Sequence, residues 1–172
     1  MMLPLHAAWL PASNNFCRAD RCRDTIGVTN SPSDIHLFDC VLSVVDVEIS
    51  SPRLRAALGW DKDLTFDVIR SQVRATLAKK PSNLPERMTT LIVYIANLFV
   101  KGKISDSEVD LLKQDIGDQP WIPVKLNELA PTRHVVFIAG IDNIGSFRKV
   151  SRRLSDVEDV IQLLRRMGCT DR

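Results

Sequence analysis

Three cysteines and a histidine in the N-terminal part of the chain are residue types that bind zinc. Cys17 and Cys22 would form one pair of ligands, and His36 and Cys40 the other. Three thiolates and an imidazole can close a tetrahedral shell around Zn²⁺. The gap between the pairs is longer than in a common zinc finger, and it holds no aromatic residue for a finger core. We therefore expect half-buried cysteines without metal, with a zinc-binding module at residues 17–40 as the alternative.

Other residues that could carry catalysis are few. The chain has 3 histidines and contains neither a Gly-x-Ser-x-Gly elbow nor a phosphate-binding glycine loop. Glu108 and Glu158 are the most regularly placed carboxylates, and each lies three residues after a serine, Ser105 or Ser155. That spacing predicts capping boxes, in which serine and glutamate satisfy the free amides at a helix start. We expect no enzymatic activity, no catalytic residue and no cofactor.

Composition limits the remaining classes of function. The 172 residues are 45% hydrophobic, enough for one globular domain of ordinary size. With 23 basic and 21 acidic residues, the net charge of +2 does not favour nucleic acid or an anionic membrane as partner. Four irregularly spaced cysteines are too few for a disulfide framework and indicate a reducing compartment. We expect a cytoplasmic protein with neither nucleic-acid nor membrane partners.

One local concentration of basic residues bears on that expectation. Its members are Arg148, Lys149, Arg152, Arg153, Arg165 and Arg166. Asp156, Glu158 and Asp159 lie among them in the sequence, and no aromatic platform is interleaved for base stacking. We predict a solvated face rather than a nucleic-acid site.

Hydrophobic periodicity predicts an α+β fold that is predominantly helical. Apolar residues at three- and four-residue steps predict four helices, at about 64–79, 84–101, 105–116 and 156–167. Runs of β-branched and aromatic residues predict short edge strands at about 121–125 and 134–139. The first 30 residues are punctuated by glycine, proline and asparagine, so residues 1–30 are predicted to be loop-rich with short strands.

A shift of the chain against itself by 109 positions indicates an internal repeat. It superimposes Phe38 on Phe147 and Leu58-Gly59 on Met167-Gly168. Both copies would end as a helix capped by a left-handed glycine. Residues 31–60 would then be the tail of one unit and residues 61–172 a second unit. Such units bury their faces against neighbours, which predicts a fragment of a larger repeat protein.

Three short motifs of this repeat resemble the sacsin family of very large chaperone-related proteins. Leu58-Gly59-Trp60 is similar to a helix-ending signature of that family, and Trp121-Ile122-Pro123 to its tryptophan-isoleucine strand. Met167-Gly168 is similar to the motif that closes a unit, so the resemblance spans roughly residues 31–171. The structural residues concerned are Leu58, Gly59, Trp60, Trp121, Pro123, Phe147, Met167 and Gly168.

The resemblance implies a non-catalytic scaffold or protein-interaction segment between the ATP-binding modules of such a protein. Its partners would be other segments of the larger parent protein, chaperones or client proteins. The chain departs from the full family pattern, because it contains neither an ATP-binding module nor the His-Pro-Asp triplet of a J-domain. An independent chaperone cycle is therefore not expected of it.

Overall fold

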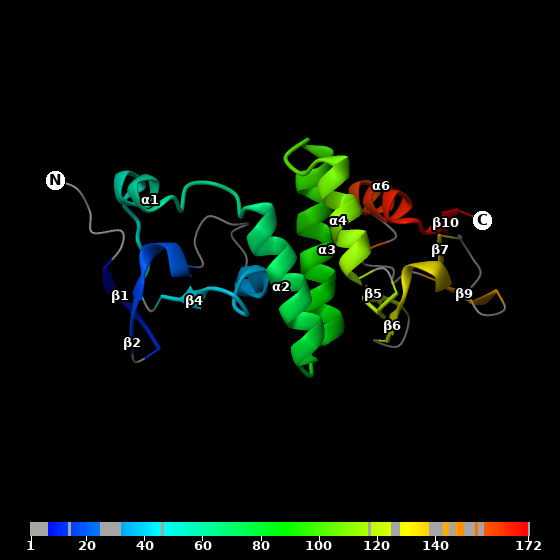
Figure 1. Cartoon of the computed structure of the whole chain (residues 1–172), viewed down its shortest axis with the longest axis horizontal. Coiled ribbons are helices and arrows are strands. Elements are labelled where there is room, and N and C mark those ends of the chain that lie inside the picture. Colours follow the sequence, from blue (N-terminus) through cyan, green and yellow to red (C-terminus); the bar gives the residue numbers. More distant parts are fainter. Residues whose placement is uncertain are drawn as a thin grey trace. The chain divides into compact units, whose positions relative to one another are not determined.

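The chain forms two compact units, Met1–Gln72 and Val73–Arg172. The computed structural model describes residues 7–13, 15–24, 32–45, 47–116, 118–124, 128–137, 143–144, 147–149, 154 and 157–171. Figure 1 follows their helices and strands along the chain, and each unit is described by itself.

Short strands open unit 1. Strand β1 (Ala8–Ala12) pairs antiparallel with β2 (Asn15–Arg18), with an irregularity in register between Ala8 and Leu10. Strand β3 (Cys22–Arg23) pairs parallel with β4 (Ser43–Val44). The remaining described elements are the 3-10 helices η1 (Ala19–Arg21) and η2 (Pro32–Leu37) and the helix α1 (Pro52–Leu58).

Residues from both predicted N-terminal segments form one core in unit 1. Its buried members are Leu10, Ala19, Cys22, Val45, Ile49, Leu58 and Trp60. Trp9, Cys17 and Leu54 pack against this cluster. Described residues of the ranges 1–30 and 31–60 thus share one core, and the predicted division at residue 30 stays a prediction.

Helix α2 (Phe66–Lys79) contains the boundary between the units. Its fully buried Gln72 accepts a hydrogen bond from the Cys40 amide and donates to the His36 carbonyl, at 2.9 and 2.8 Å. The first half of α2 is thus held to η2 and to the turn that follows it. These contacts lie within unit 1, which extends to Gln72.

Helices dominate the core of unit 2. They are α3 (Leu84–Val100), α4 (Asp106–Ile116) and α6 (Glu158–Met167), and α6 packs against both α3 and α4. The α3 side chains buried at three- and four-residue steps include Met88, Leu91, Ile92 and Ile95. No described helix is long and apolar enough to cross a membrane.

The strands of unit 2 are short. Strand β5 (Ile122–Pro123) pairs antiparallel with β6 (Leu129–Ala130). A second sheet has the order β10-β7-β9-β8, in which only β8 is antiparallel to its neighbour. Its strands are β7 (Val135–Phe137), β8 (Asn143–Ile144), β9 (Phe147–Lys149) and β10 (Thr170–Asp171), and η4 (Thr132–His134) precedes β7.

The α+β class is confirmed, with five α-helices and short strands among the described residues. α2, α3 and α4 lie within the ranges 64–79, 84–101 and 105–116, and α6 starts two residues later than predicted, at Glu158. Strands β5 and β7 fall within the predicted ranges 121–125 and 134–139, of which residues 125, 138 and 139 lie outside the described part of the chain.

Both glycines at the predicted helix ends adopt left-handed conformations. Gly59 has φ 73° and Gly168 has φ 101°. The amide after each glycine donates to a carbonyl of the last helical turn. Trp60 N donates to Arg55 O and Cys169 N donates to Leu164 O, both at 2.9 Å. These are Schellman caps, which satisfy carbonyls that the helix leaves free.

The rest of the predicted repeat does not share this likeness. Phe38 lies in a turn, whereas its counterpart Phe147 begins strand β9. The local geometry therefore matches at the ends of the two copies and differs at their beginnings. Membership of a repeat array stays a prediction.

One of the two predicted capping boxes forms. The Ser105 amide donates to Glu108 Oε2 at 2.7 Å, and the Glu108 amide donates to Ser105 Oγ at 3.3 Å. The N-cap of α6 is Val157, which has no side-chain oxygen to accept an amide. Ser155 itself lies outside the described residues.

Candidate functional site

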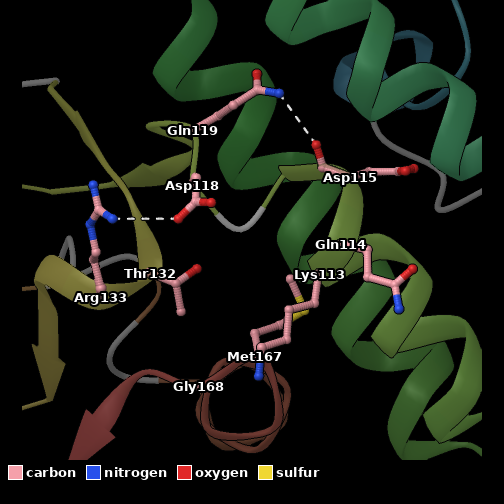
Figure 2. Close-up of a pocket in the computed structure, with 9 residues that line it drawn as sticks. All are labelled: Lys113, Gln114, Asp115, Asp118, Gln119, Thr132, Arg133, Met167 and Gly168. Carbon is pink, nitrogen blue, oxygen red and sulfur yellow. Dashed lines mark hydrogen bonds and ion pairs between the residues drawn. The ribbon is translucent and has the colours of Figure 1, made fainter.

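A hollow of about 430 Å³ in unit 2 is the candidate binding site. Figure 2 shows that its walls come from the end of α4, the segment after it, η4 and the end of α6. It is lined by Lys113, Gln114, Asp115, Asp118, Gln119, Thr132, Arg133, Met167 and Gly168. The lining therefore includes charged side chains of both signs.

Exposed charges form the rim of this hollow. Arg133 Nη1 lies 3.5 Å from Asp118 Oδ1, and the two side chains are 65% and 93% exposed (Figure 2). An ion pair this exposed is weak and readily exchanged for an incoming charge. Both groups are accordingly available to a ligand or a partner surface.

Lys113 lies at the carboxyl end of α6. A Cβ atom built at Gly168 would be 3.3 Å from Lys113 Nζ. A cation near the last turn of a helix interacts favourably with the helix dipole. The same ammonium acts on the neighbouring Cys169, whose pKa burial raises to about 12 although the charge of Lys113 opposes the rise.

The predicted motif residue Trp121 is bonded to one of the residues that line this hollow. Trp121 is 1% exposed, and its Nε1 donates to Thr132 Oγ1 at 2.9 Å. Thr132 lines the hollow, so the hydrogen bond ties the wall to the core. The sequence motif marked Trp121 but gave no signal for its partner, which belongs to another element.

The lining contains no histidine, cysteine or serine. Proton transfer or nucleophilic attack would therefore depend on Asp115, Asp118, Lys113 or the hydroxyl of Thr132, whose oxygen accepts from Trp121 Nε1. The chemistry that the hollow supports is recognition of polar or charged groups.

The four residues of the zinc alternative lie in unit 1 and are engaged elsewhere. Cys17 Sγ donates to Leu10 O at 3.4 Å, and Cys22 Sγ donates to Arg18 O at 2.9 Å. His36 Nδ1 lies 3.7 Å from Asp39 Oδ2, and the amide of Cys40 is bound to Gln72.

The structure does not gather Cys17, Cys22, His36 and Cys40 into a metal site. Across the described part of the chain, no group of three or more histidine, cysteine, aspartate or glutamate side chains could hold a metal ion. The spacing along the sequence was compatible with zinc, but Cys40 follows η2 whereas the first cysteine pair lies beside the hairpin.

A buried charge network in unit 1 was not foreseen from the sequence. Asp24 is 1% exposed, and its Oδ2 accepts from Arg55 Nη1 and from the Ile49 amide. Arg55 Nη2 also donates to the Trp60 carbonyl at 3.3 Å, and Arg23 Nη2 donates to the same carbonyl at 3.1 Å. The network thus holds the Leu58-Gly59-Trp60 helix end against the segment after β3.

The predicted basic face is partly neutralised. Arg166 donates to Asp106 Oδ1 at 2.9 Å and to Asp110 Oδ2 at 2.7 Å, which ties α6 to α4. The hydrogen bonds that Arg166 donates to Asp110 and Asp106 raise the pKa of its guanidinium group. Arg152 and Arg153 lie outside the described residues, as do the side chains of Arg148 and Lys149.

Comparisons with known proteins identify no relative: no family model, no curated protein and no solved structure matches the chain. The sacsin resemblance is therefore supported only by the short motifs at Trp60, Trp121 and Gly168.

Proposed function

We propose that the chain is a non-catalytic protein-interaction segment that acts as a scaffold in a larger, sacsin-like, chaperone-related protein of the cytoplasm. Its partners would be other segments of the parent protein, chaperones or client proteins, rather than nucleic acid or membrane. The observation that carries the proposal is the solvent-facing side of α3.

Helix α3 presents uncharged residues to solvent. No charged residue occurs between Met88 and Val100, yet Val93 is 37% exposed and Val100 is 45% exposed. Asn97, partly buried, lies between them at helical spacing, so the three share one face. A solvent-facing helix side normally carries charged residues, and an uncharged one is typical of a surface that another protein covers.

Further features support binding over catalysis. The hollow beside α4 offers opposite charges on a weak ion pair and no histidine, cysteine or serine nucleophile in its lining. Four free cysteines are consistent with a reducing compartment. The pairing of Arg166 with Asp106 and Asp110 reduces the positive field that nucleic acid would require.

The test compares surface variants of the whole chain. Light scattering and an apolar-surface dye would be applied to the wild type, to Val93→Lys with Val100→Lys, and to the control Val47→Lys in unit 1, where Val47 is 43% exposed. We expect the wild type to bind dye or self-associate, the double variant to lose both properties, and the control to keep them.

An assay with a client protein distinguishes this proposal from nonspecific self-association. The wild type should slow the aggregation of a heat-denatured reporter protein, and the double lysine variant should not. A wild type that is a dye-silent monomer without effect on the reporter would contradict the proposal.

A further inference from the structure

The solvent-facing side of α3 forms one continuous face from the first turn of the helix to its C-cap. Its members recur at three- or four-residue steps and are Glu86, Thr90, Val93, Asn97, Val100 and Lys101. Thr90 and Asn97 are half-buried, and the other four are exposed. The α3 side chains that are buried in the core of unit 2 lie on the opposite side of the helix. These six residues, named the α3 face, are therefore open to a partner.

The middle of the α3 face is uncharged. The hydroxyl of Thr90 donates to the Glu86 carbonyl at 3.2 Å, so its proton is already bound within the helix. Val93 and Val100 add exposed apolar surface beside it. A partner can cover this region without leaving a threonine proton unpaired, which would be costly in a buried interface.

The two ends of the α3 face carry opposite charges. Glu86 lies in the first turn of the helix, and Lys101 is its C-cap residue. They lie about 22 Å apart along the helix axis, at a rise of about 1.5 Å per residue. Both residues are exposed, so each can meet a charge on a partner. The α3 face is thus negative at one end, uncharged in the middle and positive at the other end.

We propose that a second copy of this chain docks on the α3 face in antiparallel orientation, about a two-fold axis beside Val93. Glu86 of each copy then lies opposite Lys101 of the other. At the same register Thr90 lies opposite Asn97, whose side-chain amide can donate to the threonine oxygen. A parallel pairing would instead place Glu86 against Glu86 and Lys101 against Lys101, so the charges select the antiparallel one.

The symmetry and size of this contact define what kind of dimer it is. A two-fold pairing uses the same patch on both copies, and the α3 face is complementary to itself in that arrangement. One helix face is smaller than a standard interface, which buries about 800 Å² per partner, so the dimer dissociates on dilution. It rests on the proposed use of the α3 face as a binding surface, and it names one occupant of that surface.

Charge reversal at the two ends tests this pairing in sedimentation velocity of the whole chain over a concentration series. The wild type should show a reversible monomer–dimer equilibrium. Glu86→Lys and Lys101→Glu each place like charges at both ends of the dimer, and each should weaken dimerisation about tenfold at low salt. An equimolar mixture of the two variants restores opposite charges at both ends and should dimerise as the wild type does.

Two further variants separate the α3 face from the rest of the surface. Val93→Lys places two ammonium groups beside the axis and should abolish the dimer, whereas the exposed Lys62→Glu in unit 1 should leave it unchanged. Circular dichroism would confirm that each variant is folded.

A wild type that stays monomeric at every concentration, or a mixture that dimerises no better than either variant alone, would overturn the antiparallel dimer. If the wild type still slowed the aggregation of the reporter protein in that case, the proposed function would stand and the α3 face would have another occupant. Rescue by mixing without any effect on the reporter would support the dimer and contradict the proposed function.

Discussion

Unit 1 and unit 2 stabilise their interiors by different means. In unit 1 a modest apolar cluster surrounds the buried charges of Arg23, Asp24 and Arg55. In unit 2 the interior is apolar helix packing, and the charged residue Arg166 forms its ion pairs at the surface. A buried charge is stable only while all of its ion-pair and hydrogen-bond partners are present, whereas apolar packing depends on side chains that fill the interior volume. The two units should therefore respond to different kinds of substitution.

The largest expected effect is the loss of Arg55. Arg55→Met removes the cationic partner of buried Asp24, and breaking such a pair typically costs about 3–5 kcal/mol of unfolding free energy. Urea titration would measure the loss, and hydrogen–deuterium exchange would place it in unit 1.

Substitutions of two other arginines serve as controls for this result. Arg53→Met changes an exposed residue of the same helix and should leave stability unchanged. Arg166→Met removes a surface ion pair of unit 2 and should have a small effect that vanishes at high salt. Equal losses from Arg55 and Arg166 would refute the contrast between the units.

The corresponding substitution in unit 2 removes apolar side-chain volume from its core. Trp121→Ala leaves a cavity and should cost about 3–5 kcal/mol, with faster hydrogen exchange around the hollow. Thr132→Val keeps the packing but leaves Trp121 Nε1 without its acceptor, and should cost about 1–3 kcal/mol. If the two variants were equally stable, the hydrogen bond and not the packing would be the dominant contribution of Trp121.

The two glycine caps allow a smaller comparison between the units. Gly59→Ala and Gly168→Ala each force a left-handed conformation on alanine, at a cost of about 1–2 kcal/mol. A Cβ atom at position 59 would meet no atom within 4 Å, whereas a Cβ atom at position 168 would lie 3.3 Å from the flexible end of Lys113, which can move aside. We expect similar losses of unfolding free energy in thermal or urea unfolding, reduced in both cases by asparagine. A much larger loss at Gly168 would show that Lys113 is held rigidly.

The smallest effects concern the helix starts of unit 2. Ser105→Ala removes the capping box of α4 and should lower stability by about 0.5–2 kcal/mol. Val157→Ser would supply α6 with the side-chain acceptor that it lacks, and should raise stability by a similar or smaller amount. Urea midpoints would measure both changes. A neutral Ser105→Ala would show that water replaces this cap without loss.

The helical parts were well predicted from the sequence because their signals are local. The apolar spacing of α3, the Ser105–Glu108 box and the glycines at positions 59 and 168 each act within a few residues. The predicted start of α6 was two residues too early. The serine motif at Ser155 is also a local signal, but the helix begins after it, at Glu158.

The candidate site was less predictable, since its parts come from elements distant in sequence. Trp121 was identified as a structural residue, but its bond to Thr132 and the adjacent hollow were not. The spacing of Cys17, Cys22, His36 and Cys40 was compatible with a shared metal, yet these residues contact different partners in the folded chain. Pairing of this kind depends on which elements pack together, and sequence spacing does not record it.

Backbone propensity and short-range hydrogen bonding decide the α+β class, most of the helix bounds and the glycine caps, so these features could be predicted from the residues. The pairing of Asp24 with Arg55 across 31 positions, and the bonds by which Gln72 joins half of α2 to unit 1, depend on how distant elements pack. A buried charge or amide is stable only where folding brings a partner to it, and that partner follows from the packing of the whole unit.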